Sequence, residues 1–255
     1  MPGRRIIASL VAGVLCAACG TSAPASPTAS AMSGTITVFG AASLTAAFTA
    51  IGNDFQRTYP GTMVKLSFGG SSTLVTQIQQ GAIGDVFASA DQPNMQKAVD
   101  AGLVSGSPSI FAHNRLEIVV AAGNPKHIMS LSDLAQSGLV VVLCAAAVPC
   151  GRYANQALQK AGVTVKPASL ETDVKAVVSK VALGEADAGI VYMTDVKAGG
   201  ATVQGVPVPL AQNVLAEYPV AVLKDSQNSP LAKAFIAYLL APGQPTLARY
   251  GFTGP

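Results

Sequence analysis

The segment from residue 35 to residue 91 alternates short β-branched runs with stretches of helical period, and this alternation constrains the fold more than any other feature. ITVFG and TMVKLSFGG have the composition of buried strands. Between them, LTAAFTAIGNDFQRTYPG places large apolar residues on one face of a helix and stops at a Pro-Gly pair. Strands and helices in this order predict right-handed βαβ units and a parallel sheet.

The same alternation starts again in the middle of the chain. GLVVVLCAAAVP and GIVYMTD are predicted strands, and TDVKAVVSKVALGEADAG is a predicted helix with valines on one face. A faint echo links the halves, because QQGAIGDVFASAD and ALGEADAGIVYMTD both run from a helix-ending glycine into a short apolar strand. We therefore predict an α/β fold of two similar lobes, each a mainly parallel sheet flanked by helices.

The predicted lobe boundaries follow from these patterns. The first lobe covers residues 35–113, the second covers residues 114–216, and residues 217–255 return to complete the first lobe. The return is predicted from YPVAVLK, which is typical of a strand, and from LAKAFIAYLLAPG, which is typical of an amphipathic helix.

The N-terminus has the pattern of an export signal. Arg4 and Arg5 supply positive charge, and the apolar run IIASLVAGVLCAA that follows them is too short to span a bilayer. Small alanines then precede Cys19. We predict that the chain leaves the cytoplasm.

The residues around the predicted cleavage point resemble the bacterial lipobox, in which a cysteine is lipidated and becomes the first mature residue. Cys16 stands where that pattern usually has leucine. We predict a signal peptide over residues 1–18, a lipid anchor on Cys19, and a flexible tether over residues 19–34, which are rich in Ser, Ala and Pro. The protein would then sit at the outer face of the cytoplasmic membrane. Ordinary cleavage near Ala18 with an unmodified cysteine is the alternative.

Composition excludes two classes of protein. Half of the residues are apolar and 11% are charged, which excludes a disordered, tail-like chain. The formal net charge is only +3, and two of the positive charges belong to the predicted leader. Nothing in this balance indicates a nucleic-acid-binding surface.

Two predicted strand ends deliver small residues and a hydroxyl onto the start of a helix. Ser43 does so in AASLTAAF, and Ser71 follows two glycines in SFGGSSTL. The first N–H groups of a helix have no partner within it and carry partial positive charge, so such a junction can bind an anion. For either serine alone, a helix N-cap is the commoner role. Two junctions at adjacent strand ends favour a ligand, because open α/β sheets bind ligands there.

Several segments together resemble the periplasmic molybdate-binding proteins of ABC importers. The resemblance covers nearly all of residues 35–255 and implies a two-lobed periplasmic-binding-protein fold that closes on molybdate or tungstate in the cleft between the lobes. It also implies a monomer without catalytic activity or cofactor, which delivers its ligand to a membrane permease. The segments that carry the resemblance are VFGAASLTAAF, FGGSSTLVTQIQQGAIGDVFASAD, VPCGRYANQAL, TDVKAVV, EADAGIVY and the terminal RYGF.

The resemblance implies five ligand-binding residues. The hydroxyls of Ser43 and Ser71 would come from the first lobe. The backbone N–H groups of Cys150 and Val174 and the hydroxyl of Tyr192 would come from the second lobe.

These donors suit an oxyanion that carries no proton at neutral pH, because such an anion only accepts hydrogen bonds. A phosphate site would benefit from a carboxylate acceptor, and the candidate loops offer only Asp173, whose position predicts a helix cap.

Two features depart from the family pattern. Gly69-Gly70 stand where relatives often have Ala-Ser, and Cys150 occupies a turn in which its backbone N–H remains available.

Other interpretations stay open at this point: a binding protein for another oxyanion such as sulfate, a secreted α/β hydrolase that uses one of the serines, or a structural surface lipoprotein. The chain has no G-x-S-x-G elbow, and His113 and His127 lack metal-site spacing, so we predict loop or surface positions for both. Turn and capping roles are predicted for four aspartates that flank strands, namely Asp85, Asp91, Asp187 and Asp195.

The last prediction is a disulfide between Cys144 and Cys150. Export brings the chain into an oxidising compartment, and only these two cysteines remain once Cys16 is removed and Cys19 is lipidated. They bracket AAAVP, where the chain must turn from a strand into a helix. A pair of buried free thiols is the main alternative, and a metal site lacks further ligands nearby. The bridge would hold the Cys150 amide towards the anion.

Overall fold

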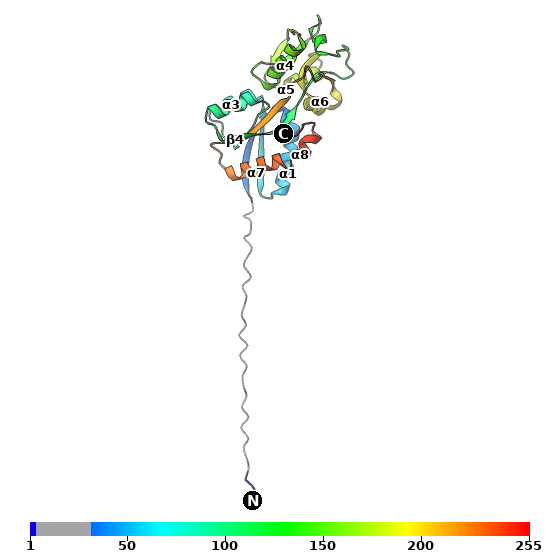
Figure 1. The fold of residues 1–255 in the computed structure, drawn as a ribbon. Coiled ribbons are helices and arrows are strands. Elements are labelled where there is room, and N and C mark those ends of the chain that lie inside the picture. Colours follow the sequence, from blue (N-terminus) through cyan, green and yellow to red (C-terminus); the bar gives the residue numbers. More distant parts are fainter. Residues whose placement is uncertain (4–31) are drawn as a thin grey trace. The chain divides into compact units, whose positions relative to one another are not determined.

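The computed structural model describes residues 1–3 and 32–255, and residues 32–255 form one compact unit. This unit contains two five-stranded sheets, one in each of two lobes (Figure 1). Cys19, most of the predicted signal peptide and most of the predicted tether lie outside the described residues, so these stay predictions. In the part that is described, no helix is long and apolar enough to cross a membrane.

The first sheet is mainly parallel, with one reversed strand. β1 pairs in parallel with β2 and β3, whereas β10 runs antiparallel to both of its neighbours, β3 and β4. This agrees with the predicted, mainly parallel sheet, and β10 is the exception because it arrives from the second lobe at the end of the chain. In spatial order the strands are β2 (Thr62–Gly69), β1 (Gly34–Ala41), β3 (Val86–Ala88), β10 (Ala216–Leu223) and β4 (Val104–Asn114).

Helices cover both faces of the first sheet. On one face, Phe48 and Phe55 of α1 meet Phe235 of α7 edge to face, and the whole predicted apolar face of α1 is buried. On the other face, Leu74 of α2 and Met95 of α3 join a separate apolar cluster. The helices are α1 (Thr45–Thr58), α2 (Ser71–Gln79), α3 (Gln92–Asp100), α7 (Ser229–Leu240) and α8 (Gln244–Arg249), and the short 3₁₀ turn η1 (Ala42–Leu44) precedes α1.

The second sheet repeats the arrangement of the first. Its fourth strand, β5, again runs antiparallel to both neighbours. The two echoing sequence segments end in β3 and β8, which are the third strands of their sheets, so the echo reflects equivalent positions. In spatial order the strands are β7 (Ser169–Glu171), β6 (Val141–Cys144), β8 (Ala188–Tyr192), β5 (Leu116–Ala121) and β9 (Val203–Pro207).

Three helices pack on the second sheet. α4 packs against β6 and β8, and α5 and α6 pack against each other and against β5. α4 ends where Gly162 adopts the left-handed conformation (φ 66°) that closes a helix without a Cβ penalty. The helices are α4 (Pro149–Ala161), α5 (Val174–Ala182) and α6 (Met193–Gly199), and the 3₁₀ turns are η2 (Leu131–Ala135) and η3 (Gly200–Thr202).

One predicted strand in the second lobe is too long. GIVYMTD ends as a strand at Tyr192, and Met193 begins α6. The Asp195 carboxylate causes the change of structure, because it accepts a hydrogen bond from the Tyr192 N–H and so starts the helix. The strand therefore delivers its tyrosine to a helix N-terminus.

The chain passes twice between the sheets. It leaves the first sheet after β4 and enters the second at β5, and it returns between β9 and β10. Two connections of this kind allow the lobes to pivot about the cleft between them.

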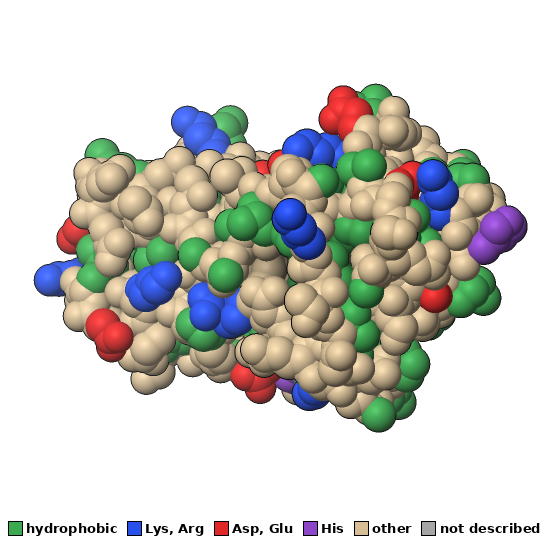
Figure 2. Space-filling view, turned by 90° about the horizontal axis from the view of Figure 1, so that it is seen from above, with side chains coloured by type: hydrophobic (Ala, Val, Ile, Leu, Met, Phe, Trp, Pro, Cys, Tyr) green, Lys and Arg blue, Asp and Glu red, His purple; other side chains and the backbone are tan. Residues whose placement is uncertain are grey.

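On the face of the molecule drawn in Figure 2, Lys and Arg side chains are scattered rather than gathered into one basic patch.

Candidate functional site

All five residues predicted to bind an oxyanion line one small cavity. Ser43 and Ser71 reach it from the first lobe, and Cys150, Val174 and Tyr192 reach it from the second. The cavity is tight and has room for about one water molecule. The lobes are therefore packed closely around a small set of donors.

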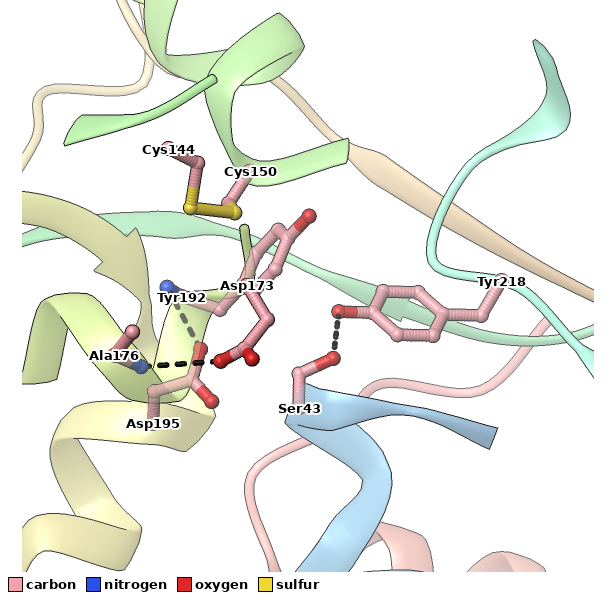
Figure 3. The surroundings of a disulfide bond; sticks show 8 residues. All are labelled: Ser43, Cys144, Cys150, Asp173, Ala176, Tyr192, Asp195 and Tyr218. Atoms are coloured by element: carbon pink, nitrogen blue, oxygen red, sulfur yellow. Dashed lines mark hydrogen bonds between the residues drawn. A yellow bond between two sulfur atoms is a disulfide. The ribbon is translucent and has the colours of Figure 1, made fainter. Parts of the chain in front are cut away.

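The two serine side chains do not cap helices. Ser43 lies inside η1, and its Oγ is 2.9 Å from the hydroxyl of Tyr218 (Figure 3). Ser71 is the first residue of α2, behind Gly70 at the N-cap, and its Oγ accepts a hydrogen bond from the Ala90 N–H at 3.0 Å. The N-cap interpretation of both side chains is wrong. The Ser71 hydroxyl accepts from the backbone and keeps its own hydrogen available for a ligand.

Three helices begin at the cavity. Ser71 starts α2, Cys150 lies in the first turn of α4, and Val174 starts α5. Within residues 32–255, no side chain caps α2 or α4, so their first N–H groups are left to the cavity. Asp173 caps α5 by accepting from the Ala176 N–H at 3.0 Å, as predicted. Three positive helix ends thus converge on one point without a basic side chain in the lining.

Tyr192 brings a buried hydroxyl to the cavity. The side chain is 1% exposed, and its hydroxyl is the one buried side-chain polar atom in the described part of the chain that has no hydrogen-bond partner. Its ring packs edge to face against the rings of Tyr153 and Tyr218. Burial, and then the neighbouring Tyr218, raise the pKa of the Tyr192 phenol well above its usual range, so the phenol stays protonated and remains a donor. A buried donor without a partner calls for a specific explanation, and a bound ion is one of them.

No carboxylate lines this cavity among the residues that the structure describes. Asp195 lies behind Tyr192 and accepts from its backbone N–H at 3.1 Å. Burial raises the pKa of Asp195 to about 7, and this effect outweighs the lowering of the pKa by that hydrogen bond. An anion in the cavity would therefore meet donors only.

The other aspartates flanking strands have the predicted turn and capping roles. Asp91 caps α3 through the Asn94 N–H. Asp85 accepts from the Thr37 N–H, and Asp187 accepts from the Val140 N–H. These bonds occupy the carboxylates in joining strands to neighbouring turns.

A disulfide joins Cys144 to Cys150 in the structure, with the two Cα atoms 5.8 Å apart. Cys144 is the last residue of β6, and Cys150 lies in the first turn of α4. The bridge ties the start of α4 to the central sheet of its lobe, directly beside the Tyr192 ring in Figure 3. It therefore limits movement of the Cys150 N–H relative to the cavity.

The histidines take no part in the site. His113 lies in β4 rather than in a loop, with Nδ1 2.8 Å from the Gly254 carbonyl oxygen, and His127 is exposed in a loop. In the described residues, no group of three or more His, Cys, Asp or Glu side chains could hold a metal ion. Sequence analysis missed Tyr218, the partner of Ser43, because a tyrosine early in the returning strand belongs to no motif.

Comparison with known proteins identifies a family and a relative that matches nearly the whole chain. A family model described as bacterial extracellular solute-binding protein matches residues 36–253. The molybdate-binding protein ModA of Mycobacterium tuberculosis is 44% identical over 253 residues, which is 98% of this chain and 96% of that protein. These matches confirm the resemblance that the sequence motifs indicated.

Two solved structures share the fold at lower identity. The periplasmic molybdate-binding protein of Azotobacter vinelandii superposes with a TM-score of 0.76 at 21% identity, over 86% of this chain and 99% of that one. The sulfate-binding protein SubI of Mycobacterium tuberculosis superposes with a TM-score of 0.79 at 22% identity, over 86% of each chain. The fold is thus common to proteins named for different tetrahedral oxyanions, and the choice of ligand has to be argued from the site.

Proposed function

The chain belongs to the bacterial extracellular solute-binding protein family, and on that premise we propose that it captures molybdate and tungstate outside the cytoplasm and delivers them to an ABC import permease. The close relative in Mycobacterium tuberculosis is named a molybdate-binding protein. The proposed location is the outer face of the cytoplasmic membrane, with the chain anchored as a monomeric lipoprotein through Cys19. In this proposal the protein acts by binding its ligand rather than by catalysis.

The observation that carries this proposal is the buried, unpartnered hydroxyl of Tyr192 in a cavity lined by donors from both lobes. A buried hydroxyl without a partner costs about 1–3 kcal/mol. A ligand oxygen at this point would recover that cost. The ligand has to be an acceptor, because Tyr192 is a protonated phenol and the other lining groups are hydroxyls and backbone amides.

The proposed binding mechanism is closure of the two lobes on the anion. Ser43 and Ser71 donate from the first lobe, while the N–H groups of Cys150 and Val174 and the hydroxyl of Tyr192 donate from the second. An anion that contacts both lobes favours the closed arrangement by the contacts that exist only there. The permease would then recognise the closed protein.

Proton content separates the candidate anions. Molybdate, tungstate and sulfate carry no proton at neutral pH, whereas hydrogen phosphate carries one and needs an acceptor. The lining described here has none, because Asp173 caps α5 and Asp195 serves the Tyr192 N–H. We therefore expect phosphate to be excluded by chemistry, whereas sulfate has the same donors open to it and is separated from molybdate only by the titration below.

Calorimetry on protein lacking residues 1–18 tests the proposal directly. Molybdate, tungstate, sulfate and phosphate are titrated in parallel at the same pH and ionic strength. We expect saturable binding of molybdate and tungstate and at least about a hundredfold weaker binding of phosphate, a difference of about 2.7 kcal/mol. Tight binding of sulfate would move the proposal to a sulfate carrier, and tight binding of phosphate would contradict the donor-only site.

A further inference from the structure

An ion pair crosses from one lobe to the other beside the cavity. Arg152 lies in α4 of the second lobe, and its Nε donates to Oδ2 of Asp91 in the first lobe at 3.1 Å. The Asp91 side chain is fully buried, whereas the Arg152 side chain is 30% exposed. The pair forms only when the lobes are together, because Asp91 precedes α3 of the first lobe and Arg152 lies in α4 of the second.

The first lobe holds Asp91 firmly in place. Its carboxylate accepts from the backbone N–H of Asn94 at 3.1 Å and from the Asn94 side-chain amide at 2.9 and 3.1 Å. The Ser89 hydroxyl also lies within 3.3 Å of it. Asp91 is therefore a fixed negative charge on the first lobe, and Arg152 is the mobile partner that arrives with the second lobe.

Both members of the pair are close in sequence to the anion-binding groups. Asp91 follows Ala90, whose N–H donates to the Ser71 hydroxyl, and Arg152 follows Cys150 by two residues on the same helix. Burial, then the neighbouring tyrosines, and then the charge of Asp91 raise the pKa of the Tyr192 phenol, so Asp91 is one of the charges that act on this side of the cavity. Without a counter-charge, this carboxylate would repel an anion bound there.

We propose that Arg152 is a positioning residue for oxyanion capture, acting through Asp91. It holds the lobes together around the anion and neutralises a buried carboxylate whose field would oppose the ligand. The inference rests on the proposed oxyanion-binding function and assigns to it a residue outside the cavity lining. Because the pair must break before the lobes separate, it acts mainly on the rate of ligand release.

A double-mutant cycle tests the role of the pair. Molybdate affinity and release rate are measured for the wild type, Arg152→Gln, Asp91→Asn and the double variant. We expect Arg152→Gln to weaken binding by roughly tenfold, mainly through faster release, since it leaves Asp91 buried and unpaired. The double variant should bind at least as well as Arg152→Gln, because it removes the repelling carboxylate as well.

The exposed pair between Arg57 and Asp54, which lies within α1, supplies the matched control. Arg57→Gln removes one arginine without touching the cleft, so its affinity and release rate should equal those of the wild type. Thermal unfolding of each variant without ligand separates lost binding from lost folding. This control matters most for Asp91→Asn, because Asp91 also caps α3 and its replacement could lower the stability of the fold.

The outcomes are distinguishable. Wild-type affinity in Arg152→Gln overturns the role of Arg152 and leaves the proposed function standing. Additive losses in the double variant also overturn it, since they would show that Arg152 and Asp91 act independently. A wild-type protein that binds neither molybdate nor tungstate overturns the proposed function itself, and the role of Arg152 with it.

Discussion

Gly70 in the first lobe lies directly against the backbone carbonyl of Thr172 in the second. A Cβ added to Gly70 would lie 2.2 Å from the Thr172 oxygen, which is closer than real atoms approach. The backbone of Gly70 has ordinary extended angles (φ −60°, ψ 135°), so it is space rather than conformation that requires glycine here. The departure from the family pattern at Gly69-Gly70 therefore sits at a point of contact between the lobes.

The first prediction concerns this contact. Gly70→Ala should weaken molybdate binding by about tenfold or more, because the added methyl group keeps the lobes apart and overpacking costs about 1–3 kcal/mol. Gly69→Ala is the matched control, since its Cβ would meet only the Leu74 side chain at 3.5 Å, an ordinary contact. Calorimetry on both variants makes the comparison. Equal affinities would show that the lobes need not approach this closely to bind.

The second prediction concerns the Tyr192 hydroxyl. Tyr192→Phe should reduce molybdate affinity by roughly ten- to a hundredfold, because the charged ligand loses a donor worth about 1.5–3 kcal/mol. The free energy of unfolding without ligand should stay the same or rise by about 1 kcal/mol, since the lost hydroxyl is buried without a partner. Urea unfolding and calorimetry measure the two quantities. A loss of stability with unchanged affinity would make the hydroxyl structural.

The third prediction concerns the serines. Ser43→Ala and Ser71→Ala should each lower molybdate affinity by about 1.5–3 kcal/mol. Each should also lower stability by about 1 kcal/mol, because Ser43 loses its bond to Tyr218 and Ser71 no longer accepts from Ala90. Ser72→Ala, one residue further along α2, is the control and should bind as the wild type does. Unchanged affinity in both variants would remove the serines from the site.

The fourth prediction concerns the disulfide. Intact-mass analysis of unreduced, denatured protein should show that Cys144 and Cys150 resist alkylation. Replacing both by serine should lower the free energy of unfolding by about 2 kcal/mol, as expected for a short closed loop. It should also weaken ligand binding, because the Cys150 N–H is less restrained. Reductant should reproduce both effects in the wild type and change nothing in the double serine variant.

The fifth prediction concerns pH and Asp195. Burial raises the folded-state pKa of Asp195 to about 7 from an ordinary value of 3.8, so the folded protein holds a proton that the unfolded chain has already released. The contribution of this carboxyl to stability is therefore full below about pH 4 and is lost as the pH rises to about 7.

Asp195→Asn removes this titration while its amide oxygen can still accept from the Tyr192 N–H. Its stability relative to the wild type should increase between pH 4 and pH 7, by at most about 4 kcal/mol for a shift of this size, and stay level above that range. Urea unfolding at several pH values measures the difference. A difference that does not change with pH would show that Asp195 ionises normally.

Much of the fold could be predicted from local sequence pattern. The apolar face of α1 and the valines of α5 recur at helical spacing, and the structure buries them, because the period of a helix fixes which side chains share a face. The strand-to-helix junctions at Ser43 and Ser71 could also be predicted from neighbouring residues, since small residues and a hydroxyl after an apolar run predict that geometry. The predicted cap at Asp173 was confirmed for the same reason.

The tertiary structure alone decided the relationships between distant residues. Ser43 and Tyr218 are 175 residues apart in the chain, and Asp91 and Arg152 are 61 apart, so no local period relates them. The fold also reversed β5 and β10 and turned Met193 into the start of a helix, since strand direction and helix starts depend on the partners that each segment meets. Sequence therefore determined the elements and the donor types, whereas packing of the two lobes determined which donors face one cavity and which glycine permits their approach.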